Sequence, residues 1–387
     1  MLKRISILFR GTLLAQLIPF ITLPLITRVF NPDEFGEYSL YLTCVTIGVI
    51  IATLRLEVAI PIMSKHSLHK DLTQIVTISI INSLFLGFLF FIGLNLFDKF
   101  TIYNTYFLSG IYTFSIIIMS YYQIYYQYGI KEGKFKELSN NKWLSQLILA
   151  VFLIVFGWAL NQYMIIALLL SQLIWIIHLQ KKLNFSINIK SVEMKNLKST
   201  LVKYKKFPKF QLPIQLLNTF SLNSMIVSVS FLYSSTELGF YSLTERLLRS
   251  PINILGSVTA DIFKNMSSKE MDEKGNSLKS YGKIMTFNFV TGIILFSFLY
   301  LFIDEIILYF FGETWVLSAV YSKYLIPSLF TMYVFFPVNY LYIVYDAQKI
   351  DLSIQTVQLV LIIIWIGIAR FQDFQITTLI IGYSSIL

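Results

Sequence analysis

The chain has 387 residues, of which 56% are hydrophobic and 13% are charged. A soluble domain carries roughly a quarter charged residues, so this composition excludes an ordinary soluble protein. The net charge of +10 would suggest nucleic-acid binding in a soluble protein, but in a membrane protein it first reports which loops face the cytoplasm. Uncharged runs of about 20 residues recur along the chain. We therefore predict an all-α polytopic membrane protein with no nucleic-acid partner.

The first half of the chain is expected to hold six membrane spans. Asn31 and Pro32, followed by Asp33 and Glu34, have the pattern of a helix start. The apolar run 143–180 would be roughly 57 Å long as one helix, against a hydrocarbon core of roughly 30 Å, so we predict two spans that turn near 157–162. The other predicted spans of this half are about 5–29, 38–63, 72–97 and 102–127.

The second half begins after a hydrophilic segment, 181–209, which is rich in lysine and has a single acid, Glu193. The predicted spans that follow are about 211–233, 239–266, 284–303, 315–345 and 352–369, with a charged loop at 267–282. The last apolar stretch, 376–387, is too short to cross the membrane, so we expect an early chain end or an incomplete twelfth helix. The sequence thus predicts about 12 helices in two six-helix lobes, 1–180 and 210–387, joined by the linker 181–209.

The distribution of basic residues predicts the orientation. If the N-terminus is cytoplasmic, most loop lysines lie on the inner side, and the outer loops hold only Lys99 and Arg370. This strong bias predicts that the N-terminus and the linker are cytoplasmic. We expect the chain to lie in the inner (cytoplasmic) membrane. Attraction of the basic loops to anionic lipid is a second explanation for the same charge.

A short motif occurs twice in the chain. Residues 35–40 (FGEYSL) and 238–243 (LGFYSL) share four of six positions at an offset of 203. Both are expected in an outer turn that enters an even-numbered helix. We therefore predict a duplication whose halves have the same orientation, as in transporters with an axis along the membrane normal.

Two blocks of sequence indicate a family. The first comprises residues 25–36 (LITRVFNPDEFG) and 52–60 (ATLRLEVAI), and the second comprises 207–213, 239–243, 246–248 and 251–256. With these blocks the chain resembles the polysaccharide flippases of the multidrug/oligosaccharidyl-lipid/polysaccharide exporter superfamily. Asp261 departs from the resemblance, because the family more often has a neutral polar residue there.

This resemblance implies a transporter rather than an enzyme. Its substrate would be a polyprenyl-pyrophosphate-linked oligosaccharide repeat unit, moved by alternating access from the cytoplasmic to the outer leaflet for O-antigen, lipopolysaccharide or capsule biosynthesis. It implies membrane lipid, a polysaccharide polymerase and glycosyltransferases as partners, and no cofactor beyond a coupling H⁺ or Na⁺. The single cysteine, Cys44, excludes an internal disulfide and a cysteine metal cluster, and a metal site at His66 and His69 is less favoured than a solvated basic turn.

Charges within apolar runs are costly and mark the candidate site. Arginine suits a diphosphate because its planar fork donates paired hydrogen bonds. The candidate substrate-binding residues are Arg246, Arg55, Arg249, Arg10, Arg28 and Lys323. Candidates for ion coupling or structural pairing are Glu57, Asp261 and Glu245.

Helical spacing suggests how some of these charges pair. Arg55 and Glu57, two residues apart on a helix, would point about 200° apart, so each would need another partner. Glu245 can pair with Arg249 at i,i+4, which makes Arg246 the cation more available to a ligand.

Structural roles compete with substrate binding at the remaining positions. Arg10 can reach the inner head groups, and Lys323 can lie at the membrane interface. Arg28 can pair with the acids that follow it at 33 and 34, and Asp261 can pair with Lys264 or bind a coupling ion. The tyrosines of 121–128 fit an aromatic interface belt better than sugar stacking.

Two other functions remain open at this point. Asp261 and Glu57 would also suit an ion-coupled drug or cation antiporter of the same superfamily. A membrane polysaccharide polymerase is less favoured, because it would usually need a sizeable outer loop with catalytic residues, and the predicted outer loops are short.

Overall fold

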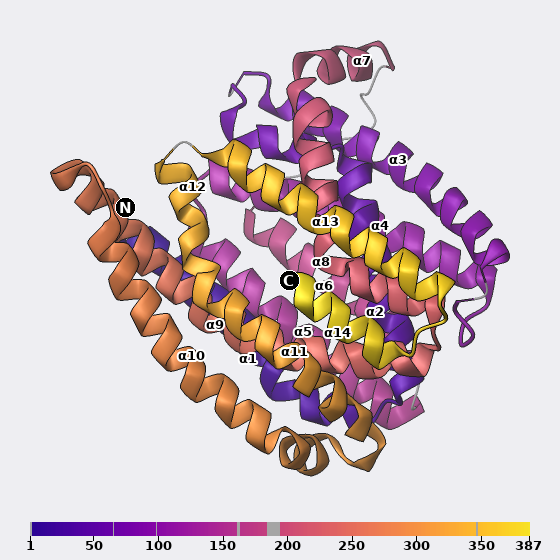
Figure 1. Cartoon of the computed structure of the whole chain (residues 1–387). Helices are drawn as coiled ribbons and strands as arrows, with labels where there is room; N and C mark the ends of the chain where they lie inside the picture. Colours follow the sequence, from indigo (N-terminus) through magenta and orange to yellow (C-terminus); the bar gives the residue numbers. More distant parts are fainter. Residues whose placement is uncertain (1, 65, 98, 161–162, 184–193, 346) are drawn as a thin grey trace. The chain divides into compact units, whose positions relative to one another are not determined.

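A computed structural model describes residues 2–64, 66–97, 99–160, 163–183, 194–345 and 347–387 of the chain. Within these residues the secondary structure is helical and contains no strand (Figure 1). Nine helices of the described chain are long and apolar enough to cross a membrane. The predicted all-α membrane class is therefore confirmed.

The helices of the first half follow the predicted runs closely. α2 begins at Pro32 with both acids in its first turn, as expected, and the run 143–180 is divided between two helices. The helices are α1 (Leu2–Thr27), α2 (Pro32–Thr53), α3 (Leu68–Leu96), α4 (Thr105–Lys131), α5 (Phe135–Leu160) and α6 (Met164–Leu183).

The second predicted span was wrong at its end. α2 stops at Thr53 instead of continuing to residue 63, and a 3₁₀ helix, Leu56–Ile62, follows it. The reason is a backbone reversal at Leu54 and Arg55, whose φ angles are 49° and 57°. An α-helix cannot pass through two left-handed residues. Each left-handed residue costs roughly 1–2 kcal/mol, so the surrounding structure must hold it in that conformation.

The second half contains one unusually long helix. α9 (Ser235–Lys274) has 40 residues and extends through the first half of the predicted charged loop, 267–282. It ends at Gly275, whose φ of 69° is the left-handed conformation of a helix C-terminus. Glu270 explains the extension, because its buried carboxylate accepts the backbone N–H groups of Lys279 (3.2 Å) and Ser280 (2.7 Å) at the start of the next helix.

The other elements of the second half are shorter. The predicted span 315–345 is interrupted by a 3₁₀ turn, Phe336–Tyr340, which contains a proline that cannot donate a helical hydrogen bond. The helices are α8 (Leu212–Leu232), α10 (Leu278–Ile306), α11 (Val316–Phe335), α12 (Leu341–Val344), α13 (Gln348–Phe371) and α14 (Ile376–Ile386), and α7 (Met194–Lys203) lies within the predicted linker.

Contacts group the chain into two compact units. The first unit comprises 1–30 and 37–223, and the second comprises 31–36 and 224–387. The six residues 31–36 thus pack in the second unit although the first unit flanks them on both sides in the sequence. The predicted division into lobes 1–180 and 210–387 with a cytoplasmic linker stays a prediction.

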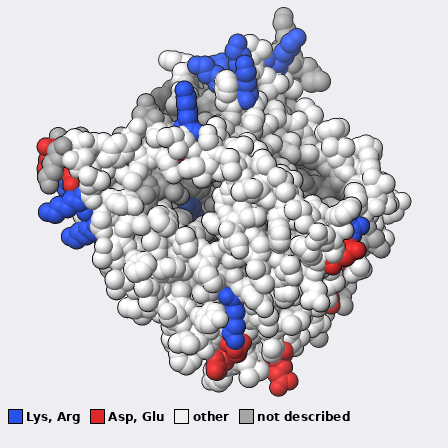
Figure 2. All heavy atoms as spheres, viewed as in Figure 1, with Lys and Arg blue, Asp and Glu red and all other residues white. Residues whose placement is uncertain are grey.

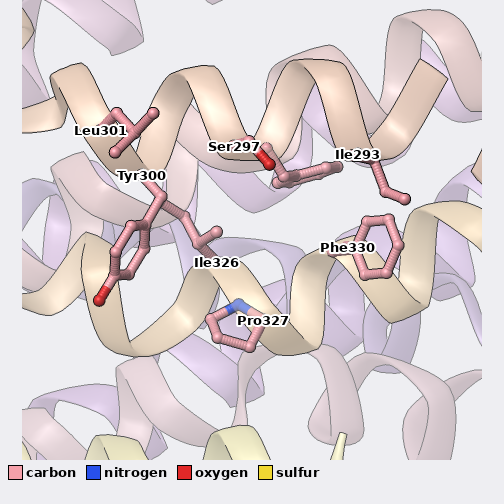
Figure 3. A pocket seen from close by; sticks show the side chains of 8 residues that line it. Ile293, Ser297, Tyr300, Leu301, Ile326, Pro327 and Phe330 are labelled. Carbon is pink, nitrogen blue, oxygen red and sulfur yellow. The ribbon is translucent and has the colours of Figure 1, made fainter. Parts of the chain in front are cut away.

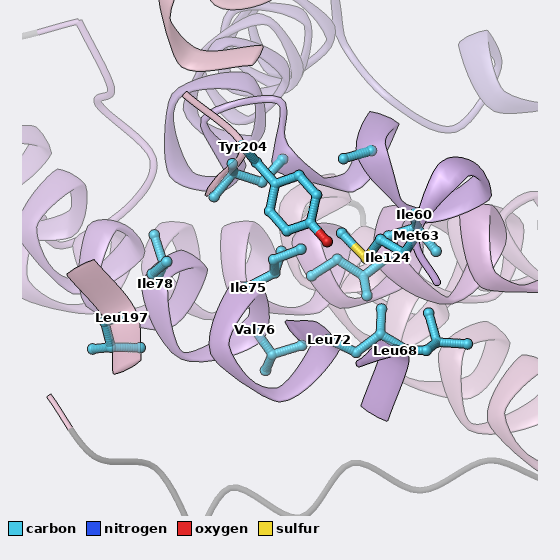
Figure 4. Packing of buried hydrophobic residues seen from close by; sticks show 12 residues of the cluster. Ile60, Met63, Leu68, Leu72, Ile75, Val76, Ile78, Ile124, Leu197 and Tyr204 are labelled. Carbon is cyan, nitrogen blue, oxygen red and sulfur yellow. The ribbon is translucent and has the colours of Figure 1, made fainter. Parts of the chain in front are cut away.

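Part of the predicted linker is a helix fastened to the first unit. Leu197 and Tyr204 are buried in a cluster with apolar residues of α3 and α4 (Figure 4). Lys203 Nζ lies 2.6 Å from Asp71 Oδ2, and the Tyr204 hydroxyl donates to the same carboxylate oxygen at 2.7 Å. The bond to Asp71 raises the pKa of Lys203 and so further favours its ammonium form. Figure 2 shows lysines and arginines gathered over α7.

Replacing Asp71 by alanine is expected to release α7. The change removes the buried acceptor of two hydrogen bonds, one of them to a charged amine, which should ease local opening of α7 by about 2 kcal/mol. Hydrogen–deuterium exchange of 194–203 and trypsin cleavage at the neighbouring lysines measure that opening. Asp304→Ala is the control, because its pair with Lys323 is more exposed and should matter little. Equal α7 exchange in the wild type and both variants would contradict this role for Asp71.

Candidate functional site

The two copies of the repeated motif contact each other in the second unit. The starts of α2 and α9 cross so closely that a Cβ at Gly36 would lie 2.1 Å from the Ser235 carbonyl oxygen, and one at Gly239 would lie 1.9 Å from the Pro32 carbonyl oxygen. The Thr236 hydroxyl also donates to Asp33 Oδ1. Gly239, Ser235 and Thr236 are the positions equivalent to Gly36, Pro32 and Asp33, because each lies 203 residues later in the chain. The two glycine contacts are therefore reciprocal, and the crossing has a local two-fold relation.

Arg246 lies beside this crossing. It is half-buried, and its guanidinium carbon lies 4.7 Å from the centroid of the Phe35 ring. The Phe35 ring is fully buried and meets Trp315 edge-on, with centroids 5.5 Å apart. Trp315 in turn meets Phe240 edge-on at 6.0 Å. The first turn of α2 and this aromatic group therefore hold a flat apolar surface against a cation of α9.

The expected pairing of Glu245 with Arg249 is confirmed. Arg249 Nε lies 2.9 Å from Glu245 Oε1, one helical turn away, and the two side chains are 19% and 14% exposed. This pair neutralises one of the two α9 arginines locally. Arg246, three residues before Arg249, contacts the Phe35 ring.

The expectation that Arg55 and Glu57 point apart was wrong. Arg55 Nη1 lies 3.0 Å from Glu57 Oε1 in an ion pair. The predicted separation assumed an α-helix through both residues, whereas the left-handed backbone at Arg55 turns its side chain toward the following 3₁₀ helix. Glu57 is buried while the Arg55 side chain remains 24% exposed. The cation is thus half-buried and paired with a fully buried carboxylate.

Replacing Glu57 by alanine is expected to disorder Arg55 and destabilise the end of α2. The left-handed backbone would lose the ion pair that helps to hold it, at a cost of about 1–2 kcal/mol, since Arg55 can regain part of its solvation. Thermal unfolding of the purified protein measures the loss. Glu57→Gln retains a hydrogen-bond acceptor and should lose less stability than Glu57→Ala. If the two substitutions cost the same, the ion pair does not hold the turn.

The other candidate residues are dispersed. Arg10, within α1, and Arg28, just after it, are exposed. Lys323 forms an ion pair with Asp304. Asp261 is exposed and has no ion pair with another described residue. The predicted alternative partner, Lys264, lies over the Tyr340 ring at 5.4 Å.

The tyrosines at the end of α4 contribute to packing. Tyr125 is buried, and Tyr122 lies 6.1 Å from Trp175 of α6 between ring centroids. Tyr126 contacts Lys142, whose amine lies 5.4 Å from the ring centroid. At least part of the cluster therefore joins helices of the first unit.

A groove between α10 and α11 has a different character. It has a volume of about 460 Å³ and is lined by Ile293, Phe296, Ser297, Tyr300, Leu301, Ile326, Pro327 and Phe330 (Figure 3). None of these residues is charged, and Leu301 is 68% exposed. The groove therefore suits hydrocarbon and cannot by itself hold a diphosphate.

Sequence reasoning missed the contact of Phe35 with Arg246. The available signal was the repeated motif, in which Phe35 is the first residue. The repeat alone does not show that its two copies touch, because that contact joins positions about 200 residues apart and depends on tertiary structure.

Solved structures with a similar fold are membrane transporters. The lipid II flippase MurJ in an inward closed conformation superposes with a TM-score of 0.77 at 13% identity, covering 97% of this chain and 84% of MurJ. An inward-facing multidrug resistance MATE family transporter of the MOP superfamily has a TM-score of 0.59 at 15% identity, over 98% of this chain and 93% of its own. A MOP superfamily transporter from Pyrococcus furiosus has a TM-score of 0.51 at 15% identity, over 99% and 92%.

These identities are low enough that the likeness shows the fold alone. No curated protein matches the sequence significantly. A family of polysaccharide biosynthesis proteins, however, matches residues 25–320. That match includes both sequence blocks, the crossing of the two motifs, Arg55 and Arg246. The chain is therefore a multi-pass membrane protein that belongs to the polysaccharide biosynthesis protein family.

Proposed function

We propose that this protein is a flippase that moves a polyprenyl-diphosphate-linked oligosaccharide from the cytoplasmic to the outer leaflet. The observation that carries the proposal is the half-buried Arg246 guanidinium, held against Phe35 at the crossing of the two motifs. Family membership supplies polysaccharide biosynthesis as the setting. The fold shared with MurJ and MATE transporters supports transport rather than synthesis.

The chemistry of the substrate matches the charges of the chain. A diphosphate-linked glycan is anionic and strongly hydrated, so it cannot cross hydrocarbon without a polar path, whereas its lipid tail can stay in the bilayer. Arg246 offers a planar donor to the diphosphate. The Arg249–Glu245 pair is already neutralised and is better suited to a supporting role. In this proposal the oligosaccharide is an O-antigen or capsule repeat unit. A polymerase and glycosyltransferases act on it before and after the flip.

Reconstitution tests this function directly. Proteoliposomes with a fluorescent polyprenyl-diphosphate oligosaccharide in one leaflet are expected to show protein-dependent transfer, read by a probe that cannot cross the membrane. Applied H⁺ and Na⁺ gradients identify the coupling ion. Absence of transfer in vesicles that contain correctly folded protein would overturn the proposal.

Two outcomes of the same preparation would favour other functions. Ion-driven dye efflux without movement of the lipid-linked glycan would favour a drug or cation antiporter. The MATE-like fold and the exposed Asp261 support this alternative. Formation of glycosidic bonds by the purified chain would favour a polymerase.

A further inference from the structure

The segment 31–36 has an unusual place in the chain. It packs in the second unit, while residues 1–30 before it and 37–223 after it belong to the first unit. The segment is therefore covalently bonded at both of its ends to residues of the first unit. Phe35 lies within the segment, and the ring it presents to Arg246 depends on the segment remaining in place.

The contacts that keep the segment in place leave no room for an added side-chain atom. At both Gly36 and Gly239 the atom that a Cβ would meet is a backbone oxygen of the opposite helix start, at 2.1 and 1.9 Å. Backbone atoms cannot swing aside as a flexible side chain can. The Thr236 hydroxyl bond to Asp33 closes the same crossing. The two helix starts are therefore fully engaged or separated, with little room between these states.

We propose that Phe35 is a positioning residue for Arg246, and that the crossing of the two helix starts couples outward opening to release of the diphosphate. With the crossing engaged, the Phe35 ring lies against the guanidinium and restricts its position. When the crossing separates, the ring is withdrawn, the guanidinium loses this restriction, and the affinity for the anion falls. This inference rests on the proposed function, because it assumes that Arg246 binds the substrate.

The aromatic character of Phe35 gives the first test. Ring-fluorinated phenylalanine keeps the size of the side chain but removes the negative face of the ring, on which attraction to a cation depends. Its incorporation at position 35 is expected to weaken binding of farnesyl diphosphate by the purified protein about 2- to 30-fold, the effect of an interaction of about 0.5–2 kcal/mol. Binding of farnesol, which lacks the diphosphate, should not change.

Phe240 is the matched control for this substitution. It belongs to the same aromatic group through Trp315, so fluorination there perturbs similar packing without changing the ring that faces Arg246. Affinity for farnesyl diphosphate should then equal that of the wild type. Equal affinity after fluorination at Phe35, or the same loss at both positions, would overturn the positioning role.

A reversible cross-link tests the coupling. Asp33→Cys with Thr236→Cys, in a Cys44→Ser background, places two cysteines at the contact that closes the crossing. Oxidised protein is expected to bind farnesyl diphosphate at least as tightly as the wild type but to flip no lipid-linked oligosaccharide, and reduction should restore flipping. Full transport by the oxidised protein would show that the crossing does not open during the cycle.

These measurements separate failure of the inference from failure of the proposed function. If the wild type neither binds farnesyl diphosphate nor flips a lipid-linked oligosaccharide, the proposed function is wrong and the inference falls with it. If the wild type does both, while fluorination at Phe35 leaves diphosphate affinity unchanged, only the inference is wrong.

Discussion

Replacement of Arg246 by glutamine is expected to abolish flipping of the lipid-linked oligosaccharide while the protein remains in the membrane at normal abundance. Glutamine retains polarity and much of the length but loses the charge and the planar fork. Loss of charge-assisted hydrogen bonds to a diphosphate, each worth about 1.5–3 kcal/mol, should lower the initial rate of flipping about 100-fold. The rate in proteoliposomes and surface polysaccharide in cells are the measurements.

Two variants control for charge and for folding. Arg246→Lys keeps the charge but not the planar fork that contacts Phe35, and should retain partial activity. Arg370→Gln, at the exposed end of α13, removes the same charge elsewhere and should leave flipping unchanged. Normal surface polysaccharide from Arg246→Gln would remove this arginine from the proposed site.

Replacement of Gly239 by alanine is expected to separate the two helix starts. The added Cβ would lie 1.9 Å from the Pro32 carbonyl oxygen, so one backbone must move away. We expect a loss of about 3 kcal/mol in the free energy of unfolding, at the upper end of overpacking effects because the obstacle is backbone, together with loss of transport. Thermal unfolding in detergent and the flipping assay measure these effects.

The reciprocal geometry predicts a reciprocal result at Gly36, where the added Cβ would meet the Ser235 carbonyl oxygen at 2.1 Å. Gly282→Ala is the matched control in α10 of the same unit, because a Cβ there meets nothing within 4 Å. It should stabilise the protein by about 0.5–1 kcal/mol, as alanine favours a helix interior over glycine. Equal stability of the Gly239→Ala and Gly282→Ala variants would mean that the crossing does not require glycine.

Local features of the sequence determined the class of the protein and many of its helices. Long apolar runs form helices because backbone polar groups in hydrocarbon must be satisfied within the segment, and the proline and acids at 32–34 begin α2 as their chemistry requires. The pairing of Glu245 with Arg249 also followed from spacing, since residues four apart on a helix are neighbours. These predictions needed no knowledge of distant parts of the chain.

Tertiary structure decided the features that give the candidate site its geometry. The ion pair of Arg55 with Glu57 exists because the backbone becomes left-handed where an apolar run suggested a continuous helix. The extension of α9 to Lys274 accompanies the bond of Glu270 to the start of α10. The cation–π contact of Arg246 with Phe35 joins residues that are far apart in the chain. Composition and periodicity describe the neighbours of a residue along one helix, whereas these contacts are set by the packing of several helices against one another.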